Sequence, residues 1–129
     1  VILTEQKKLG DTVEDLANRP DPVEKVSFNC FLNDEFVSQL NELGRNTLIL
    51  AGIEAHICVA QTALAAMDEG YDAHLVADAV SSRKKEDKEL GIARCRSEGV
   101  TITSTEMVIY ELLEMAGTDE FREVLPIVK

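Results

Sequence analysis

One cysteine stands where a buried helix is expected to begin. Cys58 follows the apolar run 47–51 and lies at the start of the apolar stretch 57–67. Backbone N–H groups and the positive end of the helix dipole stabilise a thiolate at such a position. The same N–H groups can hold the oxyanion that forms when a thiolate attacks a carbonyl. Cys58 is therefore a candidate nucleophile, and a buried, inert cysteine is the alternative interpretation.

The two histidines are weaker candidates for chemistry. His56 lies two residues before Cys58, which suggests a Cys–His dyad, but residues so close across a turn usually point apart. We therefore interpret His56 as a turn or pocket-wall residue and His74, within an expected strand, as structural. No glycine-rich phosphate loop occurs, which argues against a dinucleotide cofactor.

The stretch 47–78 must position Cys58. Residues 47–51 form a short apolar run without polar alternation, which is typical of a strand covered on both faces, and Gly52 is expected to end it. The stretch 57–67 is apolar on almost all sides and predicts a buried helix, and 71–77 predicts a second strand. A strand, helix and strand of this length make a βαβ unit with parallel strands and a right-handed crossover.

The rest of the chain also alternates strands and helices. Strands are expected at 1–4, 23–26 and 100–102. Helices are expected after Asp11, from Asn33 to Leu43, over 83–98, from a capping box at Thr103 and Glu106 to about 115, and over 118–125. This alternation predicts an α/β fold with a mainly parallel sheet.

Composition restricts the partners and the compartment. The 129 residues carry 13 basic and 24 acidic side chains, a net charge of −11, which argues against nucleic acid or an anionic membrane as a partner. No apolar run approaches the roughly 20 residues that cross a bilayer. Three cysteines without regular spacing suggest free thiols in a reducing compartment, so we expect a cytoplasmic protein.

The residues around Cys58 also carry a family resemblance. The run 51–59, with Gln61 and Thr62 after it, resembles the nucleophile signature of the isochorismatase-like cysteine hydrolases. Further blocks match in the same order at 4–6, 24–25 with Phe28, 78–83 and 105–107. The resemblance covers essentially the whole chain and is closest to the branch without an assigned substrate. It implies a Rossmann-like, three-layer fold with a mainly parallel sheet.

The resemblance assigns roles to individual residues. It implies a Cys–Asp–Lys triad in which Cys58 is the nucleophile and Lys25 is the lysine, where an ordinary solvated lysine is the alternative interpretation. It also implies a cis bond between Ile53 and Glu54, and an oxyanion hole formed by the backbone N–H groups of Glu54 and Cys58. The segment 5–16 contains none of the histidines by which the nicotinamidase branch binds a metal, so neither a metal nor a cofactor is expected.

The triad aspartate has no counterpart in the sequence. In the family it ends a first strand, which lies between the strands that match 1–4 and 47–51. Residues 1–129 are therefore expected to form a single isochorismatase-like domain that is incomplete at the N-terminus. The expected function is metal-independent hydrolysis of a small amide, imide or related carbonyl substrate through a covalent thioester, by a protein that is at least a dimer. The alternative is a catalytically silent member, or a fragment, that serves as a binding or assembly module.

Overall fold

Two parallel sheets form the framework of the chain. The computed structural model describes residues 1–16 and 21–128. The smaller sheet pairs β1 (Thr4–Gln6) with β2 (Val23–Lys25), and the larger has the order β3 (Thr47–Ile53), β4 (Asp72–Ser81), β5 (Thr101–Thr103). Every pair is parallel, so the predicted α/β class with a mainly parallel sheet is confirmed.

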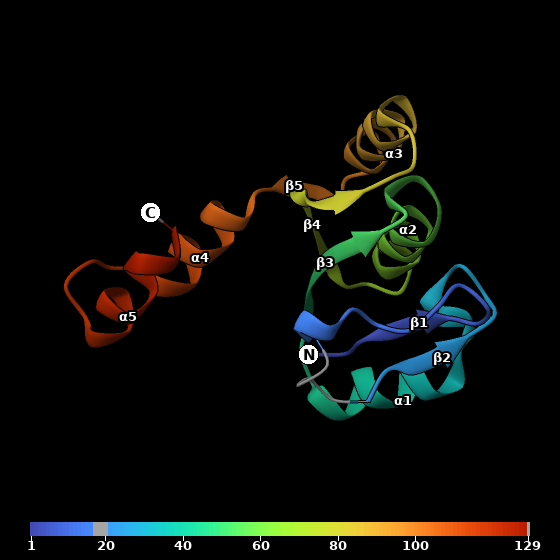
Figure 1. Cartoon of the computed structure of the whole chain (residues 1–129), viewed down its shortest axis with the longest axis horizontal. Helices are drawn as coiled ribbons and strands as arrows, with labels where there is room; N and C mark the ends of the chain where they lie inside the picture. Colours follow the sequence, from blue (N-terminus) through green and yellow to red (C-terminus); the bar gives the residue numbers. More distant parts are fainter. Residues whose placement is uncertain (17–20, 129) are drawn as a thin grey trace.

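Five α-helices are described, together with three short helical turns. The α-helices are α1 (Asp34–Leu43), α2 (Ala60–Asp68), α3 (Lys85–Ser97), α4 (Thr105–Leu113) and α5 (Asp119–Val128). The turns are the 3-10 turns η1 (Glu14–Leu16) and η2 (Cys30–Leu32) and the π-helical turn η3 (Ala55–Val59). Helices α2 and α3 cover one face of the larger sheet, α1 lies against the smaller sheet, and α4 and α5 project away from both (Figure 1).

Local sequence signals explain several of these boundaries. Asn33 Oδ1 accepts a hydrogen bond of 2.9 Å from the Phe36 N–H at the start of α1, and Gly44 ends that helix in the left-handed conformation, at φ 57°. The predicted helix 33–43 is thus confirmed. Helix α4 begins one residue later than expected, because the Ser104 hydroxyl, and not Thr103, accepts from the Met107 N–H.

The main core fills the space between the larger sheet and helices α2 and α3. Small residues dominate it, which lets the backbones approach closely. Its fully buried members are Ala55, Ala63, Ala66, Ala73, Leu75 and Cys95. A second, smaller core joins β2 to α1 and consists of Val23, Cys30, Phe36 and Leu40. The two cores share the partly buried residues Phe31, Leu48 and Tyr71, which connect the two sheets.

Strand β3 corrects two expectations. Gly52 does not end the strand: at φ +110° it lies inside β3, where the register with β4 shifts between Leu50 and Gly52, and the strand continues to Ile53. The strand is also not covered on both faces. Leu48 and Leu50 pack against the core on the α2 side, whereas Ile49 is 49% and Ile53 is 74% exposed, because the helices of the main core cover only one face.

Three other elements differ from their predicted extents. Strand β1 begins at Thr4 and ends at Gln6, whereas a strand was expected at 1–4. A helix was expected after Asp11, but in residues 11–16 only the 3-10 turn η1 is found. Positions 17–20, which follow this turn, lie outside the described residues. In α3 the buried residues are Gly91 and Cys95, and Ile92 also packs against the core, whereas Leu90 is 68% exposed.

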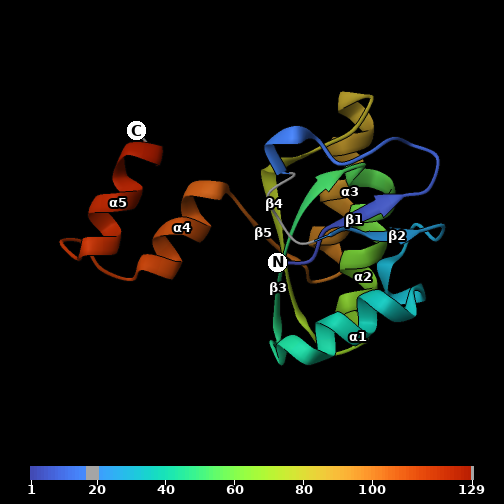
Figure 2. The same cartoon turned by 60° about the horizontal axis from the view of Figure 1, so that its bottom comes forward.

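Helices α4 and α5 form a pair that stands apart from the sheets. Neither helix contains a buried residue, and the two meet through an edge contact of the rings of Tyr110 and Phe121, whose centroids are 6.4 Å apart. Figure 2 shows the same separation from a second direction. No helix in the described part of the chain is both long and apolar enough to cross a membrane.

Candidate active site

Cys58 lies on a π-helical turn between β3 and α2. The peptide bond between Ile53 and Glu54 is cis, and η3 follows directly. The turn is wide because the Val59 N–H donates to the Glu54 carbonyl, 3.2 Å away, across five residues. Ala55 and Val59 point into the core, at 0% and 7% exposure, and Cys58 is left partly exposed. The predicted α-helix over 57–67 thus begins only at Ala60, after a turn of a different kind.

The three cysteines differ in accessibility. All three are free thiols, but Cys30 is 6% and Cys95 is 0% exposed, whereas Cys58 is partly exposed. Burial raises the pKa of the Cys95 thiol, which disfavours its thiolate. Of the three, Cys58 is therefore the thiol that a small molecule can reach from solvent.

Lys25 is buried and has only neutral partners. It is the last residue of β2, and its side chain is 4% exposed, so the interpretation as a solvated lysine is wrong. Its Nζ donates to Gln6 Oε1 at 2.9 Å, to the Ser27 carbonyl at 3.0 Å and to the Phe28 carbonyl at 3.4 Å. No carboxylate of the described residues lies within ion-pair distance of this ammonium group.

Thr62 connects the segment that follows Lys25 to the helix that follows Cys58. The Cys30 N–H donates to Thr62 Oγ1 at 3.1 Å, and Thr62 is 4% exposed. Thr62 comes about one helical turn after Cys58, so both project from the same side of the η3–α2 segment. Cys58 thus faces the side on which the segment after Lys25 docks. The sequence analysis did not predict this contact. The feature that could have indicated it is Thr62 itself, a hydroxyl residue inside an otherwise apolar helix.

His56 faces α3 and not Cys58. Its Nδ1 and Ser82 Oγ are 2.9 Å apart and share a hydrogen bond. Its Nε2 lies 3.8 Å from a Glu54 carboxylate oxygen and 3.9 Å from Asp87. Both ring nitrogens are therefore engaged on the α3 side, and the interpretation of His56 as a turn residue fits the structure. His74 Nε2 lies 3.0 Å from Asp72 Oδ2, a contact on β4.

The carboxylates that end or flank the strands already have partners. Glu54 accepts from Arg83 Nε at 2.8 Å. Asp78 accepts from the Thr105 N–H at 2.8 Å, which lowers the pKa of that carboxyl and holds the start of α4. Glu5 accepts from Thr12, and the Thr12 hydrogen bonds lower the pKa of Glu5. Among the described residues, no group of three or more His, Cys, Asp or Glu side chains is placed to hold a metal ion.

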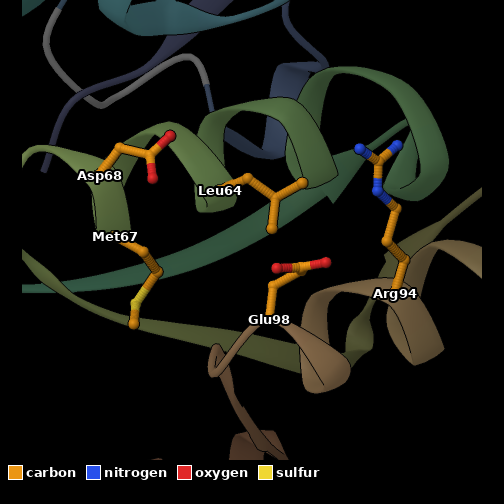
Figure 3. A pocket seen from close by; sticks show the side chains of 5 residues that line it. All are labelled: Leu64, Met67, Asp68, Arg94 and Glu98. Atoms are coloured by element: carbon orange, nitrogen blue, oxygen red, sulfur yellow. The ribbon is translucent and has the colours of Figure 1, made fainter.

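Two cavities lie away from Cys58 and Lys25. One, of about 240 Å³, lies between α2 and α3 at the end of α2 opposite to Cys58 (Figure 3). Its lining consists of Leu64, Met67, Asp68, Arg94 and Glu98. The other, of about 520 Å³, lies between the segment before β1 and the end of α1, and its lining consists of Val1, Ile2, Gln39, Glu42 and Leu43. Neither cavity contains a residue with a proposed catalytic role.

Residues 3–107 match the family model described as "Isochorismatase domain". The chain is 36% identical to isochorismatase family protein 1B of Dictyostelium discoideum, with 100% of this chain and 67% of the relative covered. It is also 36% identical to the secreted isochorismatase effector Isc1 of Phytophthora sojae, with 100% of this chain and 66% of the relative covered. The chain therefore spans about two thirds of the length of these relatives.

Solved structures share the fold. The MAR1 ribonuclease from Caenorhabditis elegans is 32% identical with a TM-score of 0.87, over 98% of this chain and 68% of that one. YcaC from Pseudomonas aeruginosa, solved with covalent acrylamide, is 26% identical with a TM-score of 0.85, over 96% and 66%. The YcaC gene product of Escherichia coli, described as an octameric hydrolase of unknown specificity, is 28% identical with a TM-score of 0.81, over 88% and 59%.

Proposed function

Since the chain belongs to the isochorismatase family, we propose that it is a metal-independent cysteine hydrolase of a small amide, imide or related carbonyl compound. The placement of Cys58 carries this proposal: it is the partly exposed thiol, and it lies on the turn between a parallel strand and a buried helix. Open α/β sheets bind their ligands at this end of the strands.

The proposed reaction has two steps. The Cys58 sulfur attacks the carbonyl carbon, an S–C bond forms, the C–N bond breaks, and the thiol proton passes to the leaving nitrogen. Water then attacks the thioester, which releases the acid and restores the thiol. The backbone N–H groups of Glu54 and Cys58 stabilise the oxyanion in both steps, and Lys25 orients the group that carries the proton.

The proton carrier is a carboxylate that we propose comes from outside residues 1–129. A buried ammonium group without a counter-ion is costly, and Lys25 has only neutral partners among the described residues. The free edge of β1 faces the side of β3 (Figure 1), and β1 and β3 each have one strand partner in the described sheets. A further strand between them would satisfy both edges and bring an aspartate beside Lys25. On this proposal residues 1–129 are most of one domain.

The alternative is a catalytically silent domain that binds or assembles. A panel of small amides and imides, assayed for release of ammonia or amine, separates the two functions. Turnover by protein that includes the further strand supports the hydrolase, and its absence with every compound supports the silent domain.

The net charge of −11 does not favour RNA as the substrate. The three free thiols agree with a reducing compartment, and we propose the cytoplasm, although one relative is described as secreted.

We also propose that the protein is at least a dimer, through α4 and α5. Their apolar side chains Met107, Leu112 and Ile127 are 52%, 74% and 77% exposed, and Met115 in the segment between the two helices is 66% exposed. Exposed apolar side chains gathered in this way mark an interaction surface. Light scattering is expected to give a mass of two chains or more, and Leu112→Glu is expected to lower that mass. Leu9→Glu, at a loop position that is 78% exposed, is the matched control and should not change it. A stable monomer at micromolar concentration would contradict this proposal.

A further inference from the structure

We propose that helix α3 positions the turn that carries Cys58, and that Gly91 and Ser82 are the positioning residues. This inference rests on the proposed function of Cys58. It goes beyond that function because α3 contributes no atom to the reaction. Two independent observations support it: a backbone contact at Gly91, and a set of polar contacts from Ser82 and Arg83, in the segment that leads into α3.

Gly91 lies against the backbone of His56. It is a buried glycine in the interior of α3, where glycine weakens a helix relative to alanine. A Cβ atom at this position would be 2.7 Å from His56 Cα, 3.0 Å from its backbone nitrogen and 3.1 Å from its Cβ. These three atoms are two backbone atoms and a Cβ atom, which a change of side-chain rotamer cannot move away. Glycine is therefore required here for space, and the distance between α3 and η3 is set by this contact.

Polar contacts fix the same turn in the other directions. Ser82 Oγ bonds to His56 Nδ1 at 2.9 Å, and Arg83 Nε donates to Glu54 Oε1 at 2.8 Å. The Arg83 N–H donates to the same Glu54 oxygen at 3.3 Å. The segment that leads into α3 thus holds Glu54, just before η3, and His56, within it. The Ser82–His56 contact is partly buried, whereas the Arg83 side chain is 79% exposed, so we assign the positioning role to Ser82.

The consequence concerns the proposed oxyanion hole. Its two N–H groups belong to Glu54 and Cys58, and His56 lies between them in the chain. In Gly91→Ala the added Cβ would push His56 away by roughly 1 Å and move one N–H donor relative to the other. A misplacement of this size can lower the rate by up to about a hundredfold. Such a shift changes transition-state stabilisation more than substrate binding, so kcat should fall while KM stays similar.

The test compares Gly91→Ala with Ala93→Ser. Each adds one heavy atom to α3, but Ala93 is exposed, whereas Gly91 is buried. In the unmodified protein we expect iodoacetamide to label Cys58 faster than Cys30 or Cys95. In Gly91→Ala the labelling rate of Cys58, followed by mass spectrometry across pH, is expected to change at least about threefold. In a separate assay of unlabelled protein, kcat is expected to fall about tenfold. Ala93→Ser should leave both unchanged.

Ser82→Ala is the second variant, because it removes a hydroxyl without adding an atom. It should change the pH profile of Cys58 labelling while the variant keeps the unfolding transition of the unmodified protein. It decides the question if circular dichroism shows that the Gly91→Ala variant does not fold. The inference is overturned if Gly91→Ala folds and keeps the unmodified labelling profile and kcat, or if Ser82→Ala keeps that profile. Labelling needs no substrate, so a protein that hydrolyses nothing contradicts the proposed function and leaves this test intact.

Discussion

Replacement of Cys58 by alanine is expected to remove all measurable hydrolysis of the best substrate in the amide panel. The nucleophile forms the covalent bond in the proposed reaction, and no other thiol of the chain is accessible, because Cys30 and Cys95 are 6% and 0% exposed. Loss of a nucleophile costs on the order of 10⁶-fold in kcat in a well-studied hydrolase. The measurement is the release of ammonia or amine by protein whose fold is checked by circular dichroism.

Cys95→Ala is the matched control for this variant. Cys95 is a core residue of α3, and its thiol has a raised pKa because it is buried, so it has no role in the proposed reaction. The control should keep its turnover and lose some stability, since a buried thiol is removed. Equal activity of Cys58→Ala and the unmodified protein would show that another group performs the chemistry.

Replacement of Lys25 by methionine is expected to lower kcat by about 10²- to 10⁴-fold, the range typical of a group that supports proton transfer. Methionine has a similar length and no charge, so the buried site stays filled. Lys25 has only neutral partners among the described residues, but in protein that includes the further strand the variant also leaves the proposed carboxylate without its ion-pair partner, so the free energy of unfolding is expected to fall as well. The measurement is kcat, together with the free energy of unfolding in urea.

Lys7→Met is the control for the charge change. Lys7 lies beside the smaller sheet, forms an exposed ion pair with Glu24 at 3.1 Å, and has no proposed role in the reaction. It should leave turnover unchanged, because exposed ion pairs contribute little. Unchanged turnover in Lys25→Met, with full activity in the control, would remove Lys25 from the site.

The elements with strong local signals were predictable from the sequence. Asn33 and Gly44 bound α1 as expected, and the βαβ unit around Cys58 has the predicted order and parallel pairing. These features depend on caps and on hydrophobic periodicity, which are readable within a short window of sequence.

The features that the sequence did not predict depend on long-range packing. The π-helical turn at Cys58 exists because Ala55 and Val59 must both reach the core, and the role of Gly91 exists because it meets His56 from a different helix. The apolar run of β3 predicted burial on both faces, yet Ile49 is half exposed. Apolar residues show that a strand can be buried, but they do not show which elements pack on each of its faces. Likewise, the burial of Lys25 follows from the docking of the 26–30 segment on Thr62.

The central claim is that Cys58 forms a thioester with its substrate. The most direct measurement is rapid acid quenching during turnover of the best amide by protein that includes the further strand, followed by intact mass and peptide mapping. We expect an added mass equal to the acyl group on the peptide that contains Cys58, and none in Cys58→Ala. Turnover without any adduct on that peptide, or an adduct on Cys30 or Cys95 alone, would contradict the claim.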